Sequence, residues 1–250
     1  MKRVVYNTLY AFGAVALFVL AWVLAHAVVG NELLVPALST TLRATATLLL
    51  KGAFWRAVFA SLLRVLVAFC ISFSFALACA VLAYALPIFR RVFAPFASFL
   101  RSLPTLCVLL VILLWTNAGV APVVVAFLSL FPMLYAGLLA GLCAVDKTLL
   151  EMSEVYRVPF KRRLARLYLP SVLPYAVREG TAGLSFALKL VVSAEVLAGA
   201  YKSLGFFMQE AKTYLETPTL FALVIVTFAI GLILECLGET LVRVIERWRA

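Results

Sequence analysis

Charged residues are scarce in this chain of 250 residues, because Asp, Glu, Lys and Arg together make up only 13% of it. A soluble domain has about 25% charged and about 45–50% apolar residues. This sequence is 66% hydrophobic, and a surplus of that size has to face lipid rather than water. The composition therefore excludes a soluble globular protein and predicts an all-α, polytopic membrane protein with no separate soluble domain.

Histidine is almost absent, since His26 is the only one and lies in the first apolar run, where we expect a packed or interfacial side chain. An intramembrane protease would need a Ser–His pair, paired aspartates or a metal cluster. The stretch Gly183-Leu184-Ser185-Phe186 lacks the second glycine of the usual nucleophile turn. The sequence also contains no dinucleotide-binding or Walker A motif. We therefore expect no enzymatic activity, no metal site and no cofactor.

Cysteine occurs without the spacing of a metal or redox site, because no CxxC pattern and no neighbouring histidine accompanies any of the five cysteines. All of them lie in or beside apolar runs, where a free thiol behaves as a small hydrophobic side chain. We therefore predict buried, unreactive thiols at Cys70, Cys79, Cys107, Cys143 and Cys236.

Apolar runs long enough to cross a membrane, which takes about 20 residues, are numerous. They lie at 8–29, 59–86, 122–143, 180–200 and 218–239. A shorter run at 102–117 predicts a sixth span. The first run begins like a signal peptide but is too long and lacks a cleavage site, so we interpret it as an uncleaved anchor helix. The stretch 33–57 is richer in Thr, Arg and Lys, which favours an amphipathic segment in the membrane interface.

Positive charge dominates, with a net charge of +11. In a soluble protein this would suggest nucleic acid, but in a membrane protein Lys and Arg gather on the cytoplasmic side. With the N-terminus inside, fifteen of the 22 basic residues are cytoplasmic, six are outside and Lys189 is in the membrane. A span at 33–57 would reverse this bias, so we predict six spans with both termini inside and no nucleic-acid partner.

One long charged segment interrupts the apolar sequence: "EMSEVYRVPFKRRLARLYLP", residues 151–170. Residues 151–157 are long enough for two helical turns, and Pro159 cannot continue that helix. Residues 159–169 predict an amphipathic helix whose apolar face holds Phe160, Leu164 and Leu167. Pro170 and Pro174 are expected to end it. The pattern suits docking against a protein, and it equally suits a solvated loop that sets topology or touches anionic membrane lipid.

The segment resembles the cytoplasmic coupling loop of ATP-binding-cassette importer permeases, in which Glu-Ala-Ala is followed by a glycine and later by Leu-Pro. Here Glu151-Met152-Ser153 stands at Glu-Ala-Ala, and Leu169-Pro170 stands at Leu-Pro. The pivot glycine is replaced by Arg157. A left-handed backbone costs a residue other than glycine about 1–2 kcal/mol, so we expect Pro159 to supply the break instead.

Other stretches in the same order resemble the same family, over most of residues 55–250. They include Phe131-Pro132 and Val145-Asp146 before the loop and Ala194-Glu195 after it. The likeness is greatest to permeases for nitrate, sulfonates, taurine and thiamine precursors. The family's Trp-Phe-Gly is Trp115-Thr116-Asn117 in this chain. This departure indicates that the substrate-facing end of this chain differs from that of other family members.

The resemblance implies a permease subunit in the cytoplasmic (inner) membrane that moves a small, in one interpretation anionic, solute inward by alternating access. It implies a homodimer, separate ATPase subunits and an extracytoplasmic substrate-binding protein. It divides the chain into an anchor helix with its interfacial segment, 1–58, and a permease core, 59–250. The residues that it assigns to ATPase coupling are Glu151, Met152, Ser153, Arg157, Pro159, Phe160, Leu164, Leu167, Leu169 and Pro170.

Two charges lie inside the fifth predicted span, Lys189 and Glu195. Six residues of helix place them about 120° and about 9 Å apart, so they cannot pair with each other and each needs another partner. By the resemblance, Glu195 belongs to a gate on the dimer axis. Lys189, nearer the middle of the membrane, would then line the path and attract an anionic solute. In the structural alternative, hydroxyls such as Ser193 satisfy them or Lys189 extends to the interface.

A secondary transporter or channel that needs no ATPase is the alternative function. Such a protein would require several carboxylates inside the membrane or a ring of charges around a pore. Only Glu195 and Lys189 meet this description, with Glu235 near a membrane face. The scarcity of membrane-embedded carboxylates therefore favours the ATPase-driven importer.

Overall fold

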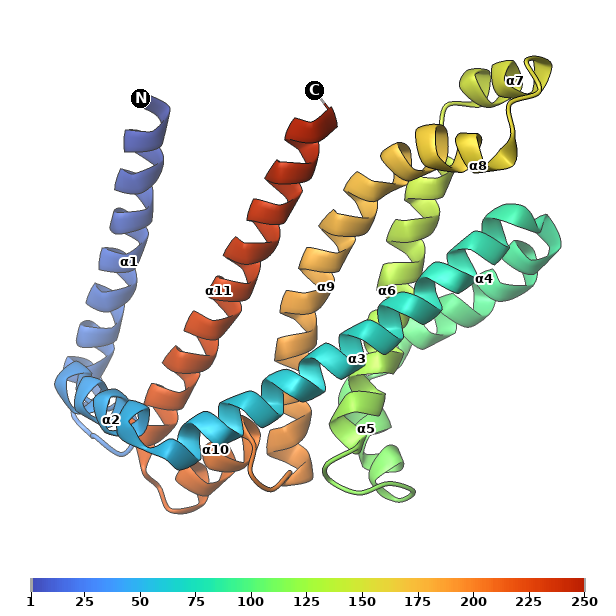
Figure 1. The fold of residues 1–250 in the computed structure, drawn as a ribbon. Coiled ribbons are helices and arrows are strands. Elements are labelled where there is room, and N and C mark those ends of the chain that lie inside the picture. The colour runs from blue at the N-terminus through green and yellow to red at the C-terminus, as the bar shows by residue number, and fades with distance from the viewer. Residues whose placement is uncertain (1, 250) are drawn as a thin grey trace.

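The computed structural model describes the backbone of residues 2–249 and the side chains of residues 16–244, and the regular elements in this range are helices (Figure 1). Their bounds are α1 Lys2–Val29, α2 Leu38–Leu50, α3 Gly52–Ala85, α4 Pro87–Ser102, α5 Thr105–Leu113, α6 Ala121–Cys143, α7 Lys147–Val155, α8 Phe160–Arg163, the π-turn η1 Leu164–Tyr168, α9 Leu169–Ala198, α10 Leu204–Thr213 and α11 Thr217–Arg249.

Four described helices are long and apolar enough to cross a membrane, and they confirm four of the predicted spans. They are Gly52–Ala85, Ala121–Cys143, Phe160–Ala198 and Thr217–Val244. The predicted span at 102–117 is corrected, because this segment is divided between α4 and α5, which are apolar and long enough for a span only together and are bent by 90° at the break between them. Leu103 and Pro104 between them have extended backbones, and proline cannot continue a helix from the preceding turn. The first predicted span, 8–29, lies within helix α1 but reaches beyond the residues whose side chains are described, in which α1 contributes the apolar stretch Ala16–Val29.

The two ends of the molecule differ in character (Figure 1). Both chain ends and the α7–α8 loop lie at the top of the view, whereas α2, α10 and the α5–α6 connection lie at the bottom. This agrees with a topology in which the termini and the charged loop share one side. The segment expected in the interface, 33–57, includes α2, which at 13 residues is too short to span, and the first residues of α3.

The topology predicts that position 46 in α2 is reached from outside the cell and position 162 in α8 from the cytoplasm. Both residues are exposed in the structure. In a chain freed of its native cysteines, Ala46→Cys is expected to react with a membrane-impermeant maleimide in intact cells. Arg162→Cys should react only after the membrane is opened. Labelling of both positions from the same side would contradict this arrangement.

The centre of the bundle is the contact of α6 with α3 and α9. Gly137 and Gly141 lie one helical turn apart on α6 and face α9 without side chains of their own. A Cβ at Gly141 would come within 2.7 Å of the Tyr175 Cβ, and one at Gly137 would collide with Glu179. Small residues at this spacing let two helices approach closely, which is how membrane helices gain packing contacts.

The prediction of buried cysteines is correct for Cys79 and wrong for the other four, which are exposed. The exposed thiols are Cys70, Cys107, Cys143 and Cys236. Periodicity identifies an apolar helix but not which of its faces meets another helix of the same chain. In a membrane protein an apolar side chain is also stable on the lipid-facing side, so burial does not follow from an apolar sequence environment.

Candidate functional site

The charged loop begins with a capped helix, α7. Asp146 is its N-cap residue, and the Asp146 Oδ1 accepts a hydrogen bond of 2.8 Å from the Thr148 N–H. The helix therefore starts before the predicted 151–157 segment, and it ends at Val155. Ser153 is buried in it, with its hydroxyl donating to the Leu150 carbonyl at 2.7 Å. The cap satisfies one of the free N–H groups in the first turn of α7 and so fixes where this helix begins.

The break after α7 lies at Arg157, whose φ is +50°. The Val158 N–H donates to the Ser153 carbonyl and the Arg157 N–H to the Glu154 carbonyl, both at 2.9 Å. These two bonds form a Schellman motif, in which the left-handed position is normally a glycine. The expectation that Pro159 replaces this turn is therefore wrong: Arg157 keeps the left-handed conformation of the missing glycine, and Pro159 caps the next helix.

Arg157→Gly is expected to stabilise the protein by about 0.5–1 kcal/mol. It removes about 1–2 kcal/mol of left-handed strain and adds about 0.5–1 kcal/mol of glycine chain entropy. Denaturant unfolding in detergent micelles measures the change. The control Arg162→Gly lies inside helix α8 and should instead destabilise by about 1 kcal/mol. Destabilisation by both variants would show that the Arg157 side chain outweighs its backbone strain.

The helix that follows the break is longer than predicted, because Phe160–Ala198 is continuous over 39 residues. The expectation that Pro170 and Pro174 end it is corrected. The π-turn η1 precedes Pro170, and the Leu169 N–H bonds to the Leu164 carbonyl in place of the usual α-helical partner. This change of register falls where the missing Pro170 N–H would otherwise interrupt the ladder, so the helix passes through both prolines.

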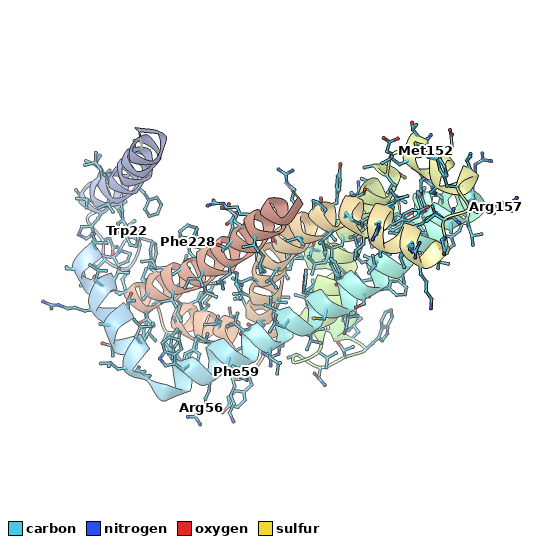
Figure 2. All side chains as sticks on the ribbon, turned by 45° about the horizontal axis from the view of Figure 1, so that its top comes forward. Trp22, Arg56, Phe59, Met152, Arg157 and Phe228 are labelled. Carbon is cyan, nitrogen blue, oxygen red and sulfur yellow. The ribbon has the colours of Figure 1, made fainter. Side chains whose placement is uncertain are left out.

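The surface of the loop is more apolar than predicted. Phe160 and Leu164 of the expected face are exposed, whereas Leu167 turns into a small cleft of about 370 Å³ inside the loop. Val155 and Tyr156 are 79% and 75% exposed, and sequence periodicity did not single them out. We call the exposed set the loop face, which consists of Met152, Val155, Tyr156, Phe160 and Leu164. Figure 2 shows Met152 and Arg157 together at this end of the molecule.

The remaining predicted loop residues frame this face. Glu151, Leu169 and Pro170 are exposed, and an ion pair of 3.3 Å joins Arg163 of α8 to Glu154 of α7. Water screens this pair, so we assign it a role in orientation rather than a large part of the stability. The two short helices therefore present one apolar surface surrounded by charges.

Glu195 is fully buried near the other end of α9. Its carboxylate accepts three hydrogen bonds, from the Arg64 guanidinium at 2.9 Å, the Ser61 hydroxyl at 2.7 Å and the Gly205 N–H at 3.3 Å. Arg64 and Ser61 belong to α3, and Gly205 lies in the first turn of α10. The partner that Glu195 needs is therefore on other elements, and the expectation that it does not pair with Lys189 is confirmed.

Further contacts extend this cluster. The Leu204 N–H donates to the Ser61 Oγ at 2.9 Å, and the Arg64 Nε donates to the Gly119 carbonyl at 3.2 Å. A Cβ at Gly205 would collide with Glu195, so only glycine fits there. The Glu195 carboxylate thus joins α9 to α3 and α10, and Arg64 extends the contacts to the α5–α6 connection, at the end opposite the loop face (Figure 1). We call Ser61, Arg64, Glu195 and Gly205 the Glu195 cluster.

Lys189 lies on a different side of α9. It is exposed and lines a cleft of about 580 Å³ between α9 and α11, together with Glu235. Ser193, which we considered as a partner for the membrane charges, is exposed. Among residues 16–244 no group of His, Cys, Asp and Glu is arranged to hold a metal ion. The structure thus separates the two charges of the fifth span into two different environments.

Spanning helices, an exposed loop face at one end and a buried ion pair at the other are an arrangement expected of a membrane transport subunit. The chain belongs to the family described as binding-protein-dependent transport system inner membrane component, which matches residues 72–248. It is therefore a multi-pass permease subunit of an ABC importer, without catalytic activity of its own, and the family implies an ATPase partner.

Named relatives agree with this assignment. A probable ABC transporter permease protein of Brucella abortus is 30% identical over 209 residues, which are 83% of each chain. The taurine transport system permease protein TauC of Escherichia coli is 24% identical over 200 residues, 80% of this chain and 72% of that one. In fold the chain is similar to a permease in inward-facing structures of the MetNI methionine ABC transporter. The TM-score is 0.64 at 18% identity, over 77% of this chain and 96% of the other.

Proposed function

We propose that this permease moves a small, charged organic solute into the cytoplasm by alternating access, driven by a separate ATPase. The observation that carries the proposal is the continuous helix Phe160–Ala198, which begins in the loop face and ends beside Glu195. At 1.5 Å per residue it is about 58 Å long. A displacement imposed on the loop face can therefore reach the opposite end as a rigid-body movement of one helix.

Coupling of this kind needs an element with two positions that is biased from both ends. ATP binding would bias it at the loop face through the ATPase. Solute delivery by an extracytoplasmic binding protein would bias it at the other end, beside α2 and α10. The Glu195 cluster makes that end move as one body, because it ties α9 to α3 and α10. In this proposal Glu195 holds the helices of the outer gate together.

We further propose that two copies of this chain form a homodimer. One chain presents one loop face, and a pair of ATPases that closes on ATP needs two. The charge of Lys189 supports an acidic group on the solute, because a cation inside a membrane attracts the opposite charge. The taurine permease among the relatives belongs to a system that transports a small molecule with such a group.

Uptake by a complete reconstituted system tests this function. Vesicles that contain the permease and its ATPase, with the binding protein outside, should accumulate solute only when ATP is enclosed. A variant ATPase that binds but does not hydrolyse ATP serves as the control. Accumulation driven by an ion gradient without ATP would contradict the proposal and favour a secondary transporter.

A further inference from the structure

Three polar residues meet between α9 and α11 in the membrane-spanning part of the chain. Ser185, Lys189 and Glu235 line the cleft of about 580 Å³, and the same three line an adjoining, mostly apolar cavity of about 260 Å³. The smaller cavity adds Met208, Phe228 and other side chains of low polarity. The junction of the two spaces therefore offers charges on one side and an apolar surface on the other.

The charges at this junction have no protein partner. Among the described residues the ion pairs are Arg64–Glu195, Arg163–Glu154 and Arg243–Glu239, and none of them includes Lys189 or Glu235. The Ser185 Oγ is buried and, within the described part of the chain, has no hydrogen-bond partner. Isolated charges and unsatisfied hydroxyls are costly in a membrane, so such groups are kept for a ligand, an ion path or water.

The packing of α9 against α11 sets the distance between the two charges. The helices contact each other where Gly231 faces Leu188 and Gly238 faces Thr181, so the chains run antiparallel with a fixed register. In this register Lys189 is opposite a position about five residues from Glu235, which is about 8 Å along the helix axis. The two side chains are long enough to span this offset, yet no ion pair joins them, so the space between them can admit a molecule a few atoms long.

We propose that Lys189, Ser185 and Glu235 form a binding site for a small zwitterion, such as an amino acid or an aminosulfonate, on its way through the permease. Lys189 and the Ser185 hydroxyl donate hydrogen bonds to the acidic group, and Glu235 accepts them from the ammonium group. Glu235 distinguishes this solute from a simple anion, which it would repel. The site rests on the proposed import function and specifies the chemical class of the solute.

The wider cleft gives such a solute a way out. Arg178 and Arg243 also line it, about 16 Å and about 12 Å along their helices from Lys189 and Glu235 respectively, on the side of the loop face. Arg243 is held by Glu239 at 3.0 Å, which leaves Arg178 as a second attraction for the acidic group. The solute would thus pass from Lys189 and Glu235 toward Arg178 at the cytoplasmic end of the cleft.

Thermal unfolding of the purified full-length chain in detergent tests the site directly. Millimolar taurine or β-alanine should raise the Tm by about 2–4 °C, because a ligand of the native state stabilises it. Ethanesulfonate and ethylammonium, which carry one charge each, should have little effect. Lys189→Met and Glu235→Gln should each abolish the response to the zwitterions. Ser185→Ala should weaken their binding about 5- to 10-fold.

Matched variants outside the cleft provide the control. Lys212→Met and Glu210→Gln change the same charges on exposed positions of α10 and should keep the full response. Absence of any Tm shift in the wild-type chain with both zwitterions would overturn the site. So would a structural ion pair, in which each single variant loses stability without ligand and the double variant Lys189→Met/Glu235→Gln regains it. Both results leave the import function intact, because ATP-dependent uptake measures that separately.

Discussion

Glu195→Ala is expected to lower the free energy of unfolding by about 3 kcal/mol. Removing one partner of a buried ion pair leaves the other charge uncompensated, which costs about 3–5 kcal/mol. Arg64 is one-fifth exposed, so water reduces the penalty toward the lower value. The Ser61 hydroxyl and the Gly205 N–H lose their acceptor as well. Denaturant unfolding in detergent micelles measures the loss.

Two further variants test whether the loss of stability comes from the unpaired charge and whether it is specific to this buried site. Arg64→Met/Glu195→Leu removes both charges and should recover most of the stability, because a buried pair replaced by apolar residues is often neutral. Glu210→Ala removes an exposed carboxylate of α10 and should change stability by less than about 0.5 kcal/mol. A loss below about 1 kcal/mol in Glu195→Ala would show that the carboxylate is not a structural centre.

The double variant also tests the gate. It is expected to fold without the hydrogen bonds that join α3, α9 and α10 at the outer end. If the cluster makes these helices move together, uptake should fall while the ATPase hydrolyses ATP without control by the loaded binding protein. Normal uptake with normal stimulation would mean that Glu195 is a satisfied buried acid and nothing more.

The sequence predicted the parts of this molecule that depend on local patterns. Apolar runs of sufficient length identified the spanning helices, because lipid imposes a minimum length on each of them. The charged loop was visible for the same reason, since seven charges within twenty residues cannot lie in hydrocarbon. Neither inference needs to know which helix packs against which.

The partners of Glu195 could not be predicted, because this requires knowing which helices pack against each other. Arg64 is one of the six basic residues that the predicted topology places outside, although it lies in the predicted span 59–86, where a lone cation is itself a signal. Pairing it with Glu195 requires that α3 and α9 be neighbours and that the two residues lie at the same depth in the membrane. The hydrophobic periodicity of a single helix indicates neither. Two opposite isolated charges near the outer ends of two spans were a reason to expect an ion pair.

Predictions from the backbone preferences of single residues also failed at two positions where the structure accepts an unfavourable conformation. Arg157 was expected to avoid the left-handed turn, yet it adopts it, with two Schellman hydrogen bonds across the turn. Pro170 was expected to stop a helix, yet the π-turn before it lets the helix continue. In both places backbone strain is accepted in the segment that we assign to coupling, which is where strained conformations often occur.

The second large effect is expected at the loop face. Tyr156→Asp/Phe160→Asp should weaken binding of the ATPase by at least about 100-fold. Exposed aromatic side chains that become buried in an interface are typical binding hot spots, each costing about 2 kcal/mol or more when removed. Both rings are largely exposed in this chain, so their loss should not disturb its fold. Titration of the ATPase against the permease in nanodiscs gives the dissociation constant.

Tyr214 provides the matched control for this experiment, because it is 72% exposed and directly follows α10, which lies at the end opposite the α7–α8 loop (Figure 1). Tyr214→Asp makes the same chemical change and should leave ATPase binding unaltered. Glu151→Lys, at the position that the family resemblance assigns to the ATPase contact, should weaken binding while the chain stays in the membrane. If ATPase affinity and uptake are both unchanged in all the loop variants, the loop only sets topology. The helix Phe160–Ala198 would then transmit no movement, because the ATPase would not bind at its cytoplasmic end.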